Sequence, residues 1–217
     1  MNTESSVRHT VSASDWDDFV AVCYFGRKGD WLDRCMWRAY LDMNRTMHGM
    51  GRFGEGHADW KSTMLRSLRD RLAMLSGEHP WTQASFDAWH HESVDALRGV
   101  SSERGFPLSV GQSQKWVNMS IKYAIALGER RLPGFHCVYD VAHVALDSIV
   151  LKRLEEQEMP ALGCAWSRLD DYSQYMECQQ WVRDNRGGIP LEVEYRLWQE
   201  APPNAGENGK QEEVNDG

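Results

Sequence analysis

Apolar residues recur along this chain at the three- to four-residue spacing of amphipathic helices, and no stretch alternates as a half-buried strand would. The clearest stripe runs through Trp60, Met64, Leu68, Leu72 and Leu75. Helices are expected over residues 12–25, 30–47, 57–75, 80–100, 147–157, 166–185 and 189–200, with a further helix that carries Lys115. The pattern therefore predicts an all-α fold of about eight helices, without an internal repeat.

Capping residues place the ends of these helices. The expected starts are at Ser14, at Thr82 or Pro80, at Ser167 and at Pro190, and the expected ends are at Gly99 and Gly128. Residues 101–111 are expected to form a loop or tight hairpin, and residues 136–146 a short irregular segment before the helix at Asp147.

No composition change marks a linker, so residues 1–200 are expected to form a single domain. Residues 201–217 are rich in Pro, Gly, Asn and acidic side chains, which is typical of a disordered acidic tail. The polar N-terminus and the absence of a long apolar run argue against export and membrane insertion. Five cysteines without a CxxC pair indicate reduced thiols, and we expect a cytoplasmic monomer.

The net charge of −8 argues against a protein that coats nucleic acid non-specifically. Local clusters of Lys and Arg could still dock a polyanion, or could be solvated helix faces. Four residues are conceivable zinc ligands: His136, Cys137, His143 and Cys164. Their spacing matches no standard zinc site. We expect neither a metal nor a cofactor.

Two segments carry candidate chemistry. The first, "VGQSQKWVNMSIKY" (residues 110–123), places Lys115 just after a Val-Gly turn, at the start of an apolar helix. A lysine is unusual there, because the positive end of the helix dipole disfavours cations. The second, "HVALDSIVLKRL" (residues 143–154), places Asp147 at a helix start, where a carboxylate also serves as an ordinary cap.

Together these segments resemble the helix-hairpin-helix DNA glycosylases. In that family a Val-Gly hairpin precedes a helix with an early lysine, and a later "V-P-V-D" segment supplies an aspartate that opens the next helix. The long interval between Lys115 and Asp147 is closest to the archaeal 8-oxoguanine glycosylase branch. The resemblance covers roughly residues 80–157 and implies a helix-hairpin-helix element around residues 81–127.

This chain departs from the family at both motifs. The hairpin reads "FPLSVG" where the family has "L-P-G-V-G", and Lys115 lies two residues later than an overlay would place it. Ala145 and Leu146 precede Asp147, so the family proline is absent.

The resemblance implies an enzyme that flips a damaged or modified base out of double-stranded DNA and cleaves its N-glycosidic bond, leaving an abasic site. Lys115 would attack the sugar C1′ as a neutral amine, which also permits lyase chemistry through a Schiff base. Asp147 would shuttle protons and stabilise the positive sugar. The expected substrate is either oxidised guanine, in DNA repair, or a hypermodified base of phage DNA, in antiviral defence.

Polar residues at the two motifs and several aromatic residues are the candidates for contacting the DNA or the flipped base. The alternative is core packing for the aromatic residues, a polar helix start for the glutamines and a structural role for the histidine. The candidates are Gly111, Gln112, Gln114, Trp116, His143, Trp166, Tyr172 and Trp31. The backbone N–H groups of residues 107–113 are expected to face a phosphate.

The alternative is a non-enzymatic helical module that binds another protein. In that case Lys115 and Asp147 would form a salt bridge or lie on separate faces, and the tryptophans would all belong to the core. The glycosylase hypothesis requires the Lys115 amine and the Asp147 carboxylate to lie about one hydrogen bond, or one bridging water, apart at a common cleft.

Overall fold

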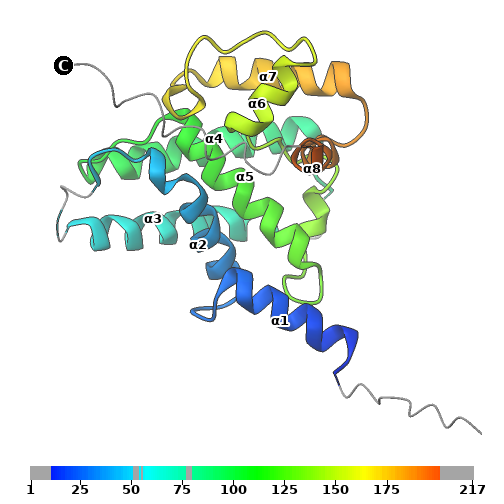
Figure 1. The fold of residues 1–217 in the computed structure, drawn as a ribbon. Coiled ribbons are helices and arrows are strands. Elements are labelled where there is room, and N and C mark those ends of the chain that lie inside the picture. The colour runs from blue at the N-terminus through cyan, green and yellow to red at the C-terminus, as the bar shows by residue number, and fades with distance from the viewer. Residues whose placement is uncertain (1–10, 51–53, 55, 77–79, 201–217) are drawn as a thin grey trace, which may run out of the picture.

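The computed structural model describes residues 11–50, 54, 56–76 and 80–200. In this part of the chain it has eight α-helices and no strand, which confirms the all-α prediction (Figure 1). The helices are α1 (Ala13–Phe25), α2 (Trp31–Met43), α3 (Gly56–Ala73), α4 (Gln83–Glu103), α5 (Val110–Leu127), α6 (Ser148–Glu155), α7 (Tyr172–Arg186) and α8 (Pro190–Glu200). Short 3-10 helices occur at Asn44–Thr46 (η1), Phe135–Val138 (η3) and Trp166–Arg168 (η4).

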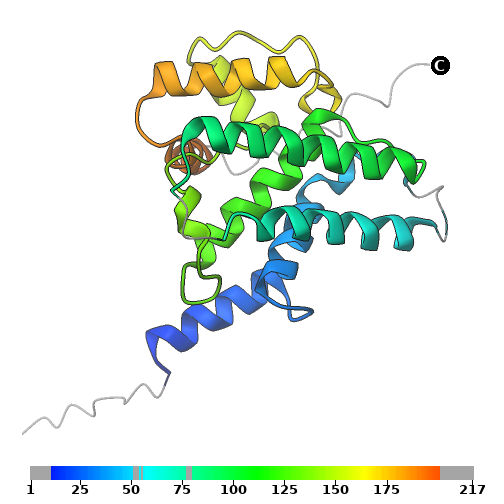
Figure 2. The ribbon, with the colours of Figure 1, turned by 180° about the vertical axis from the view of Figure 1, so that it is seen from behind.

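Helix α5 is the central element. It passes between α2 and α3 on one side and α6 and α7 on the other (Figures 1 and 2). Every residue of α5 except Tyr123 and Ala126 is buried, so the helix has no solvent-facing side. Its buried polar side chains must therefore find partners inside the protein.

The apolar side chains form two clusters on either side of α5. The larger joins α2, α3, α4 and most of α5, and the smaller joins α6, α7 and α8 with Val94 and Val110. Trp166 of η4 is partly buried and packs against both clusters. The cores thus meet at the start of α5.

Several predicted boundaries are confirmed and others are wrong. Thr82 caps α4, Gly128 ends α5 and Pro190 begins α8, as expected. Ser12, not Ser14, caps α1, because Ser12 completes a capping box with Asp15.

Gly99 and Ser167 also have other roles than expected. Helix α4 continues through Gly99 to Glu103, since a glycine inside a helix weakens it without ending it. Ser167 lies in η4, and α7 begins later with Asp171 as its cap.

The start of α5 differs from the expected Val-Gly turn. Val110 and Gly111 are the first residues of the helix, and Ser109 is its N-cap, paired with Gln112 in a capping box. Lys115 therefore lies in the second turn, where the dipole argument is weaker, and burial becomes the dominant feature of its environment. The described helices do not establish a helix-hairpin-helix element.

The predicted disordered tail, residues 201–217, lies outside the described residues. Among the described helices, none combines the length and apolar character needed to cross a bilayer.

At Gly111 the backbone of η4 and the residue after it packs directly against α5. Its N–H donates to the Leu169 carbonyl at 2.8 Å, and a Cβ here would lie 1.7 Å from the Trp166 carbonyl oxygen. A side chain at this position would therefore displace the backbone of the 166–169 segment.

We expect Gly111→Ala to lower the free energy of unfolding by about 1–3 kcal/mol, as overpacking does. The matched control is Gly99→Ala inside α4, where a Cβ meets nothing within 4 Å. That change should stabilise the protein by about 0.5–1 kcal/mol through helix propensity. Urea unfolding of both variants measures the difference, and equal effects would contradict the close approach.

Candidate functional site

Lys115 and Asp147 form a buried ion pair. The Lys115 Nζ lies 2.5 Å from Asp147 Oδ2, and the two side chains are 3% and 10% exposed. The other carboxylate oxygen of Asp147 accepts the backbone N–H groups of Ile149 and Val150 at 3.0 and 2.9 Å, as the N-cap of α6. One oxygen thus binds the helix and the other binds the lysine.

Two buried glutamines hold the chain just before Asp147. Gln114 of α5 donates to the Leu146 carbonyl at 2.8 Å and accepts the Leu146 N–H at 3.2 Å. Gln179 of α7 makes the same pair of bonds with Val144, at 2.9 and 3.0 Å. A carboxamide can satisfy both backbone groups of one residue, so this segment needs no neighbouring strand.

A second buried ion pair completes this support. Glu194 of α8 accepts the Ala145 N–H at 2.8 Å with one oxygen and binds the Lys122 amine of α5 with the other. Glu194 is fully buried, and removing Lys122 would leave its carboxylate without a charge partner. Helices α5, α7 and α8 therefore all fix the position of Asp147.

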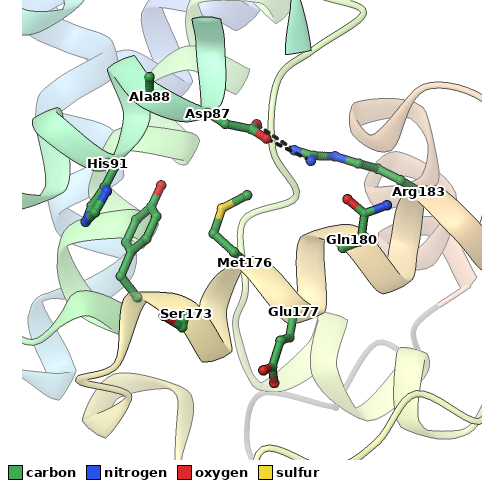
Figure 3. A pocket seen from close by; sticks show the side chains of 9 residues that line it. Asp87, Ala88, His91, Ser173, Met176, Glu177, Gln180 and Arg183 are labelled. Carbon is green, nitrogen blue, oxygen red and sulfur yellow. Dashed lines mark hydrogen bonds and ion pairs between the residues drawn. The ribbon is translucent and has the colours of Figure 1, made fainter. Parts of the chain in front are cut away.

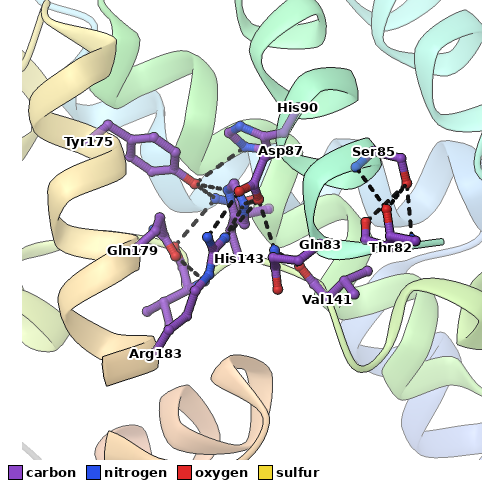
Figure 4. Close-up of polar contacts among 12 residues, drawn as sticks. Thr82, Gln83, Ser85, Asp87, His90, Val141, His143, Tyr175, Gln179 and Arg183 are labelled. Carbon is purple, nitrogen blue, oxygen red and sulfur yellow. Dashed lines mark hydrogen bonds and ion pairs between the residues drawn. The ribbon is translucent and has the colours of Figure 1, made fainter. Parts of the chain in front are cut away.

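A second polar network links α4 to α7 through the chain before Asp147 (Figure 4). Asn118 of α5 joins it to Gln114, to which it donates at 3.1 Å. The His143 ring lies 2.7 Å from Asp87 Oδ1 through Nε2 and 2.8 Å from the Tyr175 hydroxyl through Nδ1. The His90 Nδ1 lies 2.8 Å from the Tyr172 hydroxyl, and the His90 Nε2 lies 3.4 Å from that of Tyr175. The Asn118 amide of α5 also donates to the Tyr175 hydroxyl at 2.9 Å.

Burial and hydrogen bonds shift the titration of this network. Burial lowers the pKa of His90 well below 6.5, and the nearby His143 adds to the effect. Burial also lowers the pKa of His143, although Asp87 opposes the shift. Burial alone would raise the pKa of Asp87, but hydrogen bonds from His143, Arg183 and Gln83 outweigh it and hold that pKa well below its usual value. At neutral pH the network therefore holds neutral imidazoles beside an ionised carboxylate.

An open pocket lies between α4 and α7, above this network (Figure 3). Its residues are Asp87, Ala88, His91, Tyr172, Ser173, Met176, Glu177, Gln180 and Arg183. The Tyr172 ring stacks on His91 at 4.0 Å between centroids, and Arg183 binds Asp87 with two hydrogen bonds.

Neither Lys115 nor Asp147 lines this pocket, nor a smaller one between residues 159–162 and α7. The hydrogen bond expected between the two residues is present. The common cleft that was expected at this pair is not seen in the described part of the chain, where the pair is enclosed. A DNA base could reach the amine only after the surrounding chain moves.

The residues expected to contact DNA at the start of α5 have partners inside the protein. Gly111 N–H bonds to Leu169, and the Gln112 and Ser113 N–H groups bond to Ser109. The Gln112 side chain donates to the Thr46 carbonyl at 3.0 Å. Gln114, as described, holds Leu146.

Of the tryptophan candidates, one lies in the core and two are half-buried. Trp116 is fully buried, donates to the Met36 carbonyl and stacks against Trp60, as the core alternative requires. Trp31 is half-buried beneath the Arg34 guanidinium. Trp166 is also half-buried, beside the start of α5.

His143 and Tyr172, by contrast, belong to the α4–α7 network, with Tyr172 on the pocket rim. Sequence reasoning missed the partners of these two residues. Asp87 and His90 lie one helical turn apart on a face that also carries Phe86, and this spacing was the available signal. Tyr175 and Arg183 lie two turns apart on α7 and carried no comparable signal. Among the described residues no cluster of His, Cys, Asp or Glu could hold a metal ion.

We expect the free energy of unfolding to fall as the pH drops from about 7 to about 5. The unfolded chain protonates its histidines near pH 6.5, whereas burial keeps His90 and His143 neutral in the folded protein. Each such histidine contributes a slope of up to about 1.4 kcal/mol per pH unit. Urea unfolding across this pH range measures it.

The variant His90→Asn should reduce this slope, and the exposed His48→Asn serves as its control. A slope that is equal in the wild type and in His90→Asn would show that other groups cause the pH dependence.

Comparison of the chain with protein-family models, with curated proteins and with solved structures gives no match in any of the three. The resemblance carried by "SVGQSQKW" and "VALDS" therefore stays a prediction from the residues. The structure adds the contact between Lys115 and Asp147.

Proposed function

We propose that this protein is a DNA glycosylase that excises a damaged or modified base, with Lys115 and Asp147 as its catalytic pair. The observation that carries the proposal is the 2.5 Å contact between the two groups, both withdrawn from solvent. A lysine and a carboxylate at this distance can exchange a proton directly, which is the first step that amine attack requires.

The chemistry follows from the two groups. Asp147 accepts a proton from the Lys115 ammonium, and the neutral amine forms a bond to C1′ while the bond from C1′ to the base breaks. The departing base takes this proton from Asp147. Cleavage of the bond from C1′ to the ring oxygen, with transfer of a proton from the lysine nitrogen to that oxygen, then gives a Schiff base on Lys115. Where water attacks C1′ in place of the amine, the ionised Asp147 stabilises the positive sugar and the product is an abasic site.

The supports around Asp147 suit this role. Its Oδ1 is fixed by two N–H groups of α6, which leaves Oδ2 directed at the amine. Gln114, Gln179 and Glu194 hold the preceding chain, so the carboxylate cannot drift from the lysine. A carboxylate that is already held in position needs little rearrangement when the transition state forms.

The substrate base is proposed on the resemblance alone. Oxidised guanine follows from the archaeal branch, and a hypermodified base of phage DNA is the other candidate. Trp166, half-buried beside the start of α5, is the aromatic candidate for stacking on a flipped base.

A non-enzymatic role in binding another protein remains the second candidate, and two observations favour it. The Lys115–Asp147 contact is enclosed, as a structural salt bridge would be. Helix α1 also exposes large apolar side chains, Trp16, Phe19 and Val20, at helical spacing. Both hypotheses predict the salt bridge, so only chemistry separates them.

Base release and covalent trapping are the decisive measurements. The protein is incubated with duplex DNAs that carry oxidised guanine or phage-type hypermodified bases, with and without borohydride. We expect release of one class of base, and an adduct wherever the amine attacks. Lys115→Ala should abolish the adduct, whereas Lys152→Ala, an exposed lysine in α6, should retain it.

Asp147→Asn should lower the rate of base release by about 10²–10⁴, the usual contribution of a general acid or base. An asparagine can still cap α6, so thermal melting distinguishes lost chemistry from lost folding. Base release that persists in both Lys115→Ala and Asp147→Asn would remove this pair from the mechanism. No release from any DNA would favour the non-enzymatic role.

A further inference from the structure

We propose that Arg45 and Arg168 form a phosphate-binding surface that docks duplex DNA over the start of α5. This inference rests on the proposed function for its partner, DNA, and assigns to these two arginines the contact that the helix start itself does not make. Both are exposed, and each lies in a 3-10 turn that is hydrogen bonded to the first turn of α5.

The need for side-chain contacts follows from the capping of α5. Helix starts often bind phosphate through free N–H groups. Here the N–H groups of Gly111, Gln112 and Ser113 are taken by Leu169 and Ser109. A duplex that docks at this end of α5 must be held by other groups.

The two arginines are attached to this end of α5 by direct hydrogen bonds of neighbouring residues. Gln112 donates to the carbonyl of Thr46, the residue after Arg45, at 3.0 Å. Ser109 donates to the carbonyl of Ser167, the residue before Arg168, at 2.8 Å. Both exposed arginines therefore lie in turns that are bonded to the start of α5, about one helical turn before Lys115.

Their charges are also uncompensated. Within the described chain, most arginines have an acidic partner: Arg38, Arg69, Arg71, Arg98, Arg104, Arg130, Arg131, Arg153, Arg183 and Arg196. Six described arginines have none there: Arg27, Arg34, Arg45, Arg66, Arg168 and Arg186. Of these six, Arg45 and Arg168 lie in turns that are bonded to the start of α5, so they supply unpaired positive charge at this end of the helix.

The acidic residues next to Arg168 do not cancel it. Asp170 binds Arg98 at 2.7 Å, and Asp171 accepts the Ser173 N–H at 2.8 Å as the cap of α7. A guanidinium group without an internal carboxylate is well suited to bidentate binding of a phosphate.

The test is the salt dependence of binding to an unmodified duplex of about two helical turns. Each phosphate contact steepens the slope of log Kobs against log salt by about 0.9. Arg45→Ala and Arg168→Ala should each weaken binding and reduce the slope by about 0.9, and the double variant by about 1.8. Fluorescence anisotropy over a series of salt concentrations measures this.

The control is Lys28→Ala. Lys28 is an exposed cation without an ion pair in the described chain, and it lies in the α1–α2 turn at the opposite end of the molecule (Figures 1 and 2). Its substitution should leave both affinity and slope unchanged. Equal slopes for the wild type, the arginine variants and Lys28→Ala would overturn the docking surface, as would a wild-type protein that does not bind duplex DNA.

The two proposals fail separately. Reduced slopes in the arginine variants, together with no base release from any DNA, would support the docking surface and contradict the glycosylase proposal. Base release that is undiminished in the double variant at elevated salt would support the glycosylase proposal and contradict the docking surface.

Discussion

The structure depends on the hydrogen bonds made by three residues of irregular backbone in its interior. Residues 144–146 pass through the core without a helix or a strand partner in the described fold, and an unsatisfied buried amide is costly. Three side chains from three helices, Gln114, Gln179 and Glu194, supply the missing partners. This arrangement draws α5, α7 and α8 together, and the same contacts bring Asp147 to Lys115.

The helical content of the chain could be read from its sequence because apolar spacing and capping residues are local signals. Thr82, Gly128 and Pro190 mark their helix ends for reasons that involve only a few neighbouring residues. The boundary at Ser167 failed because tertiary contacts decided it: the 166–169 backbone packs on Gly111, far away in sequence.

The candidate pair was predictable in part. The sequence placed Lys115 near a helix start and Asp147 as a cap, and their contact is what the glycosylase hypothesis and the salt-bridge alternative both expected. The second polar network was not predictable, because His143 joins Asp87 and Tyr175 only when α4 and α7 pack around the irregular segment before Asp147. The hydrogen bonds that Gln179 and Glu194 make to the backbone of that segment also depend on long-range packing, which no local pattern encodes.

The burial of α5 on all sides has a consequence for how the protein comes apart. Helix α5 contributes apolar side chains to the larger cluster and hydrogen bonds to the segments that carry the smaller one. Unfolding of one cluster would therefore displace α5 and disrupt the other cluster as well. The clusters should therefore behave as one cooperative folding unit. A substitution on either side of α5 would then change the stability of the whole molecule, including the arrangement around Lys115.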